Sequence, residues 1–354
     1  MLRGALIGFG NVAANGHVPG WLARPDVEIV AVSDTNEARR FEAEHLLPHA
    51  RWYDSGETLL AEEGLDFVDV CTPPSGHADL IRTALKQGLH VLCEKPLVTR
   101  PEDLAELSIL AGSARKTLYT VHNWHHAPII EFVRDLLQRR EIGSITRCVW
   151  QTLRMKPAAA VGGQSGNWRL DPRIAGGGVL VDHGWHACYV ILNWLEQRPT
   201  AISAKLENRR HVDSPLEDTA TVHIQFPRAT VELFLTWAAD ERRNMVEITG
   251  DRGTIRVVNN SVLLSLVGPR EGGSRWELAS GLSEGSHHPE WFGGVVSGFL
   301  AEIADDTVRG RNFVEAALCV DMLALAQLSS RENSAWLPMP DPVTEEKTKI
   351  GAQQ

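Results

Sequence analysis

The sequence predicts an α/β protein with two domains: a doubly wound parallel sheet at the N-terminus, then an α+β domain with a large, mostly antiparallel sheet. Three observations predict this architecture. The chain has 354 residues, whereas single cores stop growing beyond about 250–300 residues. Short apolar runs alternate with helical patterns in its first third. From about residue 123, segments rich in alternating and β-branched residues follow one another directly.

Five apolar runs mark the strands of the first domain, which we assign to residues 1–122. In chain order they are RGALIGFG, VEIVAVSD, FVDVCTPP, HVLCEKP and KTLYTVHN. Helical patterns such as SGHADLIRTALKQG stand between them. Strands that alternate with helices pair in parallel, because each helix carries the chain back to the same edge of the sheet.

The second domain, residues 123–340, begins with a helix over about 126–138. The strands that follow are SITRCVWQTL, TAISAKLE, TATVHIQF, ATVELFLTW, NMVEITG, GTIRVV and SVLLSLV. Short connections between consecutive strands predict antiparallel pairing. Two helices, about 290–308 and 313–330, close this domain, and the polar residues 341–354 are predicted to form a frayed tail.

The composition is that of a soluble globular protein, with 43% hydrophobic and 23% charged residues. A formal net charge of -10 argues against nucleic acid or an anionic membrane as a partner and favours a small molecule. The five cysteines form no CxxC pair and mostly lie in apolar runs, which is typical of a reducing compartment. No uninterrupted apolar stretch reaches the about 18 residues of a membrane span, and the apolar start is too short for a signal peptide. We therefore expect a cytoplasmic protein.

A glycine-rich turn follows the first predicted strand. Residues 8–13 read GFGNVA, the pattern G-x-G-x-x-A, in which Gly8 permits a tight turn and Gly10 lets the backbone approach a pyrophosphate. The small Ala13 lets the next helix pack closely, with its N-terminal N–H groups facing the phosphates. The second strand ends at Asp34, near the spacing of the acidic residue that binds ribose hydroxyls. This context predicts a dinucleotide-binding Rossmann domain rather than a ligand-free turn.

Asp34 also bears on the choice of cofactor. Its carboxylate accepts hydrogen bonds from a 2′-hydroxyl and repels a 2′-phosphate, which favours NAD. Arg39 and Arg40, in the next helix, keep NADP open, although arginines in such positions are more often solvated.

Two further segments, CTPPSGH at residues 71–77 and HVLCEKP at residues 90–96, each end an apolar strand, where ligands bind in an open α/β sheet. A partly desolvated Lys95 at such a strand end can handle a proton or bond a reacting oxygen. Taken alone, Lys95 is better interpreted as a surface lysine before a turn proline.

The stretch GGGVLVDHGWHACYVILNW, residues 176–194, predicts an apolar helix after three glycines. Asp182, His186, Tyr189 and Asn193 recur at helical spacing and form one narrow polar stripe. Such a stripe lines a cavity or faces solvent.

Together, GFGNVA, CTPPSGHADL, EKPL and GGGVLVDHGWH, in this order, resemble the Gfo/Idh/MocA oxidoreductases, named for glucose-fructose oxidoreductase and inositol dehydrogenase. The resemblance implies a Rossmann domain and a C-terminal domain whose open sheet mediates homodimer or homotetramer contacts. Lys95 matches the catalytic lysine of the family, with a cis-proline at Pro96, and Asp182 and His186 match its aspartate and histidine. The arginine common after Asn123 is replaced here by Trp124, so that contact does not transfer.

The predicted site follows from these motifs and the resemblance. The catalytic residues are Lys95, Asp182 and His186. The cofactor-binding residues are Gly8, Gly10, Asn11, Val12, Asp34, Thr72, Pro73, His77, Glu94, Lys95 and Asn123. The substrate-binding residues are Lys95, Asn123, Trp168, Arg169, Asp182 and His186, with Arg173 as a weaker candidate.

These assignments predict an NAD(P)-dependent oxidoreductase that transfers hydride between nicotinamide and a secondary alcohol or ketone of a sugar, a polyol such as inositol, or a sugar derivative. His186 takes the hydroxyl proton, Asp182 orients the imidazole or holds a neighbouring hydroxyl, and Lys95 bonds the reacting oxygen. The alternatives are a non-catalytic NAD(P)-binding sensor on the same fold and an enzyme with other redox chemistry.

No metal site is predicted, because a zinc site needs three or four converging ligands. Of the histidines at positions 122, 125, 126, 183 and 186, only His186 shares a helical face with a carboxylate, that of Asp182.

Overall fold

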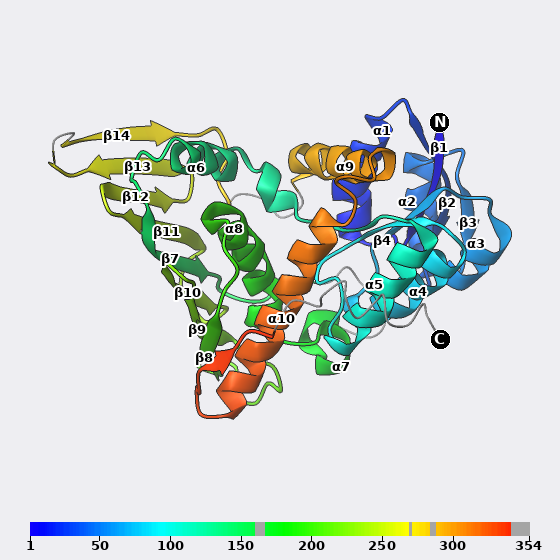
Figure 1. Ribbon diagram of the computed structural model, residues 1–354. Coiled ribbons are helices and arrows are strands. Elements are labelled where there is room, and N and C mark those ends of the chain that lie inside the picture. The colour runs from blue at the N-terminus through cyan, green and yellow to red at the C-terminus, as the bar shows by residue number, and fades with distance from the viewer. Residues whose placement is uncertain (160–166, 269–270, 284–287, 341–354) are drawn as a thin grey trace, which may run out of the picture.

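The structure is a computed structural model that describes residues 1–159, 167–268, 271–283 and 288–340. It contains two sheets with helices between and around them (Figure 1). The tail predicted over residues 341–354 lies outside the described residues.

The first sheet has six parallel strands in the order β3-β2-β1-β4-β5-β6. Their bounds are β1 Leu2–Ile7, β2 Val27–Ser33, β3 Arg51–Tyr53, β4 Phe67–Val70, β5 His90–Cys93 and β6 Leu118–Thr120. The chain order reverses between β1 and β4, the switch point at which open α/β sheets bind ligands. The predicted doubly wound parallel sheet is confirmed. The edge strand β3 was not predicted, because three residues make too short an apolar run to detect.

The helices of this domain are α1 Val18–Leu22, α2 Arg40–Leu46, α3 Gly56–Glu62, α4 His77–Lys86 and α5 Glu102–Ala114. A π-helical turn, η1 Ala13–His17, precedes α1 directly after the glycine-rich turn. Such a turn carries one extra residue and is often found at functional sites. Here it contains His17, which is buried.

The second sheet has nine strands in the order β14-β13-β12-β11-β7-β10-β9-β8-β15. The strands are β7 Ile145–Leu153, β8 Ala201–Glu207, β9 Thr219–Gln225, β10 Thr230–Thr236, β11 Arg243–Gly250, β12 Gly253–Val258, β13 Ser261–Leu266, β14 Gly272–Glu277 and β15 Leu337–Pro338. Among these strands only β7 and β10 pair in parallel, which confirms the mostly antiparallel sheet. Strands β14 and β15 were not predicted: β14 lacks apolar alternation and β15 has two residues.

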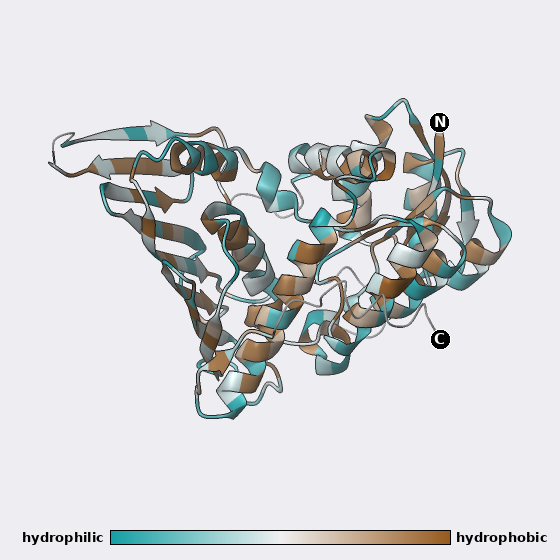
Figure 2. Ribbon diagram, in the orientation of Figure 1, coloured by the Kyte–Doolittle hydropathy of each residue, from teal (hydrophilic) through white to brown (hydrophobic). Residues whose placement is uncertain are grey.

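Helices α6 Pro128–Gln138, α8 Trp185–Leu195 and α10 Arg311–Arg331 lie on the face of the large sheet that is turned toward the parallel sheet (Figure 1). The short helix α7 Pro172–Ala175 precedes the glycine run. Apolar residues dominate α8 and alternate with polar ones along the strands beneath it (Figure 2). Among the residues that the structure describes, Figure 1 shows no helix on the opposite face of the sheet. The helix layer therefore lies between the two sheets.

Helix α9, Pro289–Ala304, was predicted to close the second domain, and in the structure it packs on the first domain as well as on the segment Asn123–His126 of the second. Its Phe292 and Phe299 belong to the core of the parallel-sheet domain, with Trp21 and Phe67. The rings of Phe67 and Phe299 meet edge to face with centroids 5.6 Å apart. Sequence position did not reveal this, because an apolar face does not specify which of two neighbouring cores it covers.

By length and hydropathy, α10 is a candidate for crossing a membrane, and it is the one such helix in the described part of the chain. In this structure Ala316, Cys319 and Met322 of α10 are buried in the main core. Glu315 of the same helix bonds two histidines of the segment before α6. These contacts are those of a core helix in a globular domain.

Candidate active site

A cleft between the two domains consists of two hollows that share part of their walls. The larger, of about 640 Å³, lies along the glycine-rich turn and the carboxyl ends of β1 and β2. The smaller, of about 220 Å³, is lined by Lys95, Asp182 and His186 among others. Val12, Cys71 and Thr72 belong to both walls. The three residues predicted to be catalytic are thus gathered at one end of a single cleft.

The two glycines of the glycine-rich turn, Gly8 and Gly10, serve different purposes. Gly8 has a φ of +91°, and a Cβ there would lie 2.8 Å from the backbone nitrogen of Thr72, so the fold itself requires glycine. A Cβ on Gly10 would meet no atom within 4 Å. Gly10 lines the larger hollow with Asn11 and Val12, at the start of the first helix. The space left by its missing side chain fits a pyrophosphate bound to helix N–H groups.

Asp34 lies in the wall of the larger hollow, as the dinucleotide prediction requires. Its two carboxylate oxygens accept from the backbone N–H groups of Phe9 at 2.6 Å and Asn36 at 2.8 Å. Each oxygen keeps a further lone pair, so the carboxylate remains able to accept from ribose hydroxyls. These bonds hold Asp34 against the glycine-rich turn.

Arg39 and Arg40, which kept NADP possible as the cofactor in the sequence analysis, differ in position. Arg39 lines the hollow, but its Nε donates to the carbonyl of Phe9 at 2.7 Å and its guanidinium pairs with Glu42. Arg40 pairs with Glu37 and Glu44 and does not line the hollow. The geometry therefore favours a free 2′-hydroxyl at Asp34.

Thr72 and Pro73 line the larger hollow, but the predicted cofactor contact His77 does not. The His77 side chain is fully buried, and its ring nitrogens lie 2.9 Å from the carbonyl oxygen of Pro96 and 2.8 Å from that of Thr72. His77 therefore ties together the loops after β4 and β5, behind the cleft wall. Sequence order alone placed it in the wall, because it follows Thr72 and Pro73.

Lys95 follows β5 and Glu94, and the peptide bond to Pro96 is cis, as the family resemblance implied. Its Nζ donates to the backbone carbonyl of Asp182 at 2.9 Å and to the carboxylate Oδ1 at 3.2 Å. Burial raises the pKa of Asp182, but the charges of Lys95, His183 and Arg169 outweigh it and hold that pKa well below its usual range. Lys95 and Asp182 therefore form an ion pair at the cleft wall.

Asp182 and His186 were predicted one regular helical turn apart, and the structure corrects this detail. Asp182 lies in a π-helical turn, η6 Leu180–Gly184, and His186 in the α-helix that follows. The glycines before η6 allow Glu217 to approach, and its carboxylate accepts from the N–H groups of Gly178 and Leu180 at 2.9 and 3.0 Å. A carboxylate at a helix N-terminus stabilises that end.

His186 is held by two aromatic neighbours. Its Nδ1 lies 2.9 Å from the hydroxyl of Tyr189, and its ring stacks on Trp124 with centroids 4.5 Å apart. The same hydroxyl accepts the backbone N–H of Trp124 at 2.9 Å. The hydroxyl hydrogen of Tyr189 is then free to donate to Nδ1, which leaves the proton of neutral His186 on Nε2.

Burial, with the charges of Lys95 and His183, lowers the pKa of His186 well below its ordinary value. The imidazole is therefore neutral at pH 7. When the Tyr189 hydroxyl rotates, its oxygen can instead accept from an Nδ1–H, and the Nε2 lone pair becomes available. His186 can thus present either a donor or an acceptor to the cavity.

The polar stripe predicted along this helix lines the cavity only in part. Tyr189 is fully buried behind His186. Asn193 lines a separate hollow of about 660 Å³ at the far end of α8, together with Trp194. Only the first two members of the stripe, Asp182 and His186, reach the cleft.

Asn123, Trp168, Arg169 and Glu94, which were predicted to bind substrate or cofactor, also line the smaller hollow. Arg173, the weaker substrate candidate, does not, because it is 87% exposed and pairs with Asp171 at 2.7 Å. Trp168 and Arg169 come from a segment before α7, and the Arg169 guanidinium lies 4.2 Å from the Trp168 ring centroid.

Sequence reasoning missed many residues of this wall, among them Arg154, Lys156, His183 and Arg242. One signal was available for Arg154, which follows β7 directly and thus stands at a strand end. Arg242 comes from the loop before β11, and nothing local marks it as part of a site.

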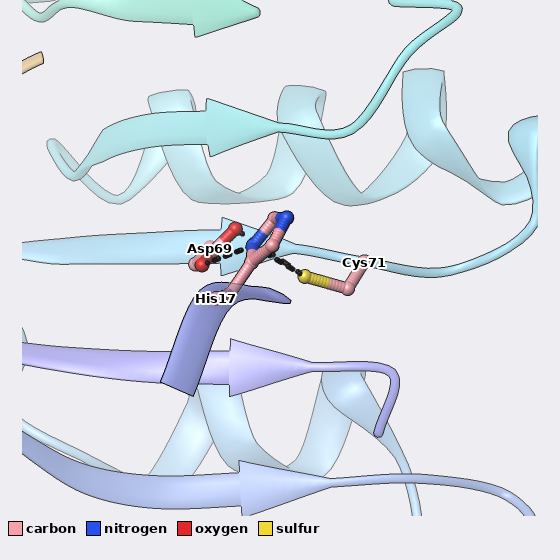
Figure 3. A group of neighbouring side chains, drawn as sticks. All are labelled: His17, Asp69 and Cys71. Atoms are coloured by element: carbon pink, nitrogen blue, oxygen red, sulfur yellow. Dashed lines mark hydrogen bonds and ion pairs between the residues drawn. The ribbon is translucent and has the colours of Figure 1, made fainter. Parts of the chain in front are cut away.

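His17 holds Glu94 beside Lys95. Its Nδ1 lies 2.8 Å from Asp69 and 3.1 Å from Cys71 Sγ (Figure 3). Its Nε2 lies 3.0 Å from Glu94. Burial lowers the pKa of His17, but Asp69 and Cys71 outweigh it, so the pKa is raised well above its ordinary value. A doubly protonated His17 donates to both carboxylates.

A second cluster joins His122 and His125 to Glu315 of α10, at 2.7 and 2.8 Å. In this cluster, and in the set His17, Asp69 and Cys71, the possible ligand atoms lie within 4.8 Å of one another. The prediction of no metal site rested on which residues share one helix face. The sequence did not reveal that these side chains, from separate elements, converge. That prediction stays untested.

Comparisons with known proteins agree with both domains. The profile described as an oxidoreductase family with an NAD-binding Rossmann fold matches residues 2–122, and the GFO/IDH/MocA C-terminal domain profile matches residues 130–256. A dTDP-3,4-didehydro-2,6-dideoxy-alpha-D-glucose 3-reductase of Saccharopolyspora spinosa is 30% identical over 268 residues, which are 72% of this chain and 74% of that protein.

D-glucoside 3-dehydrogenase of Escherichia coli K12 is 32% identical over 198 residues, 54% of each chain, so the match spans about half the length of that relative. Among solved structures, an oxidoreductase domain protein from Kribbella flavida superposes with a TM-score of 0.81 at 23% identity, covering 96% of this chain and 99% of that one. This likeness shows the fold.

Proposed function

Because the chain belongs to the Gfo/Idh/MocA oxidoreductase family and carries its NAD-binding Rossmann domain, we propose that it is an NAD-dependent dehydrogenase. Its substrate is a secondary alcohol, or the matching ketone, of a sugar, a polyol or a related derivative. One observation carries the proposal: Lys95, Asp182 and His186 meet at the end of the cleft that also contains Gly10 and Asp34.

Lys95 is the donor to the reacting oxygen. An ammonium group has three N–H donors, and Asp182 accepts two of them, one at its carbonyl and one at its carboxylate. The third N–H remains for the substrate. A bound nicotinamide supplies the hydride acceptor or donor in this chemistry. Asp182 keeps the ammonium in place, and the ammonium stabilises negative charge on the alkoxide oxygen.

His186 moves the proton. In its acceptor form it takes the hydroxyl proton at Nε2 during alcohol oxidation, and in its donor form it bonds a ketone oxygen. Tyr189 supports both forms through the rotation of one hydroxyl group. The lowered pKa keeps the ring neutral, as a proton acceptor must be.

The test is a screen of turnover by absorbance at 340 nm, with NAD⁺ and a panel of sugars, glycosides, inositols and sugar acids. We expect NADH formation with members of one of these classes, lost in a Lys95→Met, His186→Ala double variant that still binds NADH. Binding of NADH by the wild-type protein without turnover on any compound would instead favour a cofactor-binding sensor.

Asp34 is expected to set the preference for NAD over NADP. In Asp34→Ala the bonds to the ribose hydroxyls and the repulsion of a 2′-phosphate are both lost, so kcat/KM with NAD⁺ falls about tenfold or more relative to NADP⁺. Steady-state kinetics with each cofactor measure this ratio. Arg40→Ala is the matched control, because Arg40 does not line the hollow. An unchanged ratio in Asp34→Ala would remove the carboxylate from cofactor selection.

We also propose that the chain forms a homodimer or homotetramer through the face of the large sheet that carries no helix (Figure 1). On that face Phe234 and Met245 flank Gln151 in register, and both are only half-buried. Light scattering after gel filtration is expected to give a multiple of the chain mass, and Phe234→Glu to give the monomer with NADH binding intact. A monomeric wild-type protein contradicts this.

A further inference from the structure

The wall of the smaller hollow is rich in cations. Arg154, Lys156, Arg169 and Arg242 line it in addition to Lys95. Its two carboxylates are already engaged, Glu94 by His17 and Asp182 by Lys95. This concentration of positive charge stands in a chain whose formal net charge is -10, so it is a local feature of the site.

Arg154 is the most informative of these cations. Its residue is 4% exposed, and its guanidinium donates to the carbonyls of Leu153 and Arg243 and to the side-chain oxygen of Asn244. No carboxylate within the described residues forms an ion pair with it. Burial, followed by the charge of Arg242, lowers its pKa to about 10. A buried charge without a counter-charge is costly, and an anionic ligand would offset that cost.

The arginines lie at the reacting end of the cleft. Arg154 and Arg242 both act electrostatically on His183, the neighbour of Asp182, and burial together with these charges lowers the His183 pKa to about 3. The charge of Asp182 acts on Arg154 in turn and raises its pKa, against the larger effect of burial. Gly10 and Asn11, by contrast, line the larger hollow and not the smaller. Arg154, Lys156, Arg169 and Arg242 line both hollows and so stand where the two meet, and their effect on His183 and Asp182 points to the reacting side of that boundary. The helix N-terminus at Gly10 and Asn11 is placed for the dinucleotide phosphates.

We propose that the substrate is a carboxylated sugar, such as a uronic acid or its glycoside, whose carboxylate is bound by Arg154 with Arg242 and Lys156. This rests on the proposed function, which places the substrate alcohol at Lys95 and His186. A guanidinium binds a carboxylate through paired, charge-assisted hydrogen bonds. The hollow of about 220 Å³ is smaller than a typical site for a drug-sized ligand, which suits one sugar unit.

The test compares matched acidic and neutral ligands by calorimetry on the protein saturated with NADH. Methyl glucuronide and methyl galacturonide differ from methyl glucoside and methyl galactoside only in the carboxylate. At least one acid is expected to bind about tenfold or more tightly than its neutral partner, a preference that weakens with added salt. If neither acid binds better than its partner, the proposal is overturned.

Variants locate the effect. Arg154→Gln is expected to abolish the preference for the acid, and its affinity for NADH is measured alongside because Arg154 lines both hollows. Because Arg154 is buried and the variant can fail to fold, Lys156→Gln, at an exposed position, is the second test and should reduce the preference several-fold. Arg173→Gln, outside the cleft, is the control and should leave the preference for the acid intact. Loss of NADH affinity without loss of acid preference would assign these cations to the cofactor phosphates and overturn the proposal.

The outcomes also separate this proposal from the proposed function. Oxidation of a neutral glycoside with no preference for the acid leaves the dehydrogenase assignment standing and removes the acidic substrate. Preferential binding of the acid without NAD⁺-dependent turnover leaves the acidic ligand standing and removes the dehydrogenase assignment.

Discussion

Replacing Lys95 by methionine is expected to lower kcat by about 10²–10³-fold, the range found when one donor to a developing oxyanion is removed. Methionine keeps much of the length and apolar volume of the side chain but removes the N–H that faces the substrate oxygen. The affinity for NADH, measured by fluorescence titration, should stay nearly the same, because the glycine-rich turn and Asp34 are untouched. An unchanged kcat would show that the ammonium takes no part in the reaction.

The control for Lys95→Met addresses Asp182, which loses its main counter-charge in that variant. His183 at 3.6 Å and Arg169 at 3.9 Å remain near its carboxylate. In the double variant Lys95→Met, Asp182→Asn the uncompensated charge is absent, so thermal stability should recover while kcat stays low. Recovery of kcat along with stability would mean that the single variant had failed through its charge imbalance alone.

Replacing His186 by alanine is expected to lower kcat by about 10²–10⁴-fold, the usual contribution of a general acid or base. His186 lies in the smaller hollow and not in the larger, so NADH binding should be kept. Steady-state kinetics on the identified substrate measure the loss. Turnover at the wild-type rate would remove the histidine from the mechanism.

The wild-type protein should show the lowered pKa of His186 directly. Because burial, Lys95 and His183 lower that pKa, the ring stays neutral below the ordinary value of 6.5 and becomes protonated only as the pH falls through the lowered value. The kcat for alcohol oxidation is therefore expected to be flat down through pH 6.5, with its acid limb below that. A limb at or above pH 6.5 would contradict this.

Tyr189→Phe separates positioning from catalysis. It removes only the hydroxyl that bonds His186 Nδ1 and accepts from Trp124. The acid limb of kcat should shift and kcat should fall by less than in His186→Ala, while KM changes little. A merely structural role would lower stability and leave the limb in place.

Much of the cofactor end could be predicted from sequence because its interactions are local or follow from strand order. Gly8 needs a positive φ in a tight turn, and Asp34 ends the next strand beside that turn. That Lys95 lies in one site with Asp182 and His186 was expected only through the resemblance to a family, and the bond between Lys95 and Asp182, 87 residues apart, was not predicted. No spacing rule connects two side chains so far apart in the chain.

The sequence by itself determined the two-domain order, the parallel and antiparallel sheets and the motifs at strand ends, because these depend on periodicity, turn residues and chain length. Only the tertiary structure decided that α9 covers the parallel sheet, that His77 lies behind the wall, and that Arg154 stands at the reacting end. His17 meets Glu94 and His122 meets Glu315 for the same reason. Burial and long-range contact are properties of how surfaces pack together, and apolar surfaces select their partners by shape and area rather than by their order along the chain.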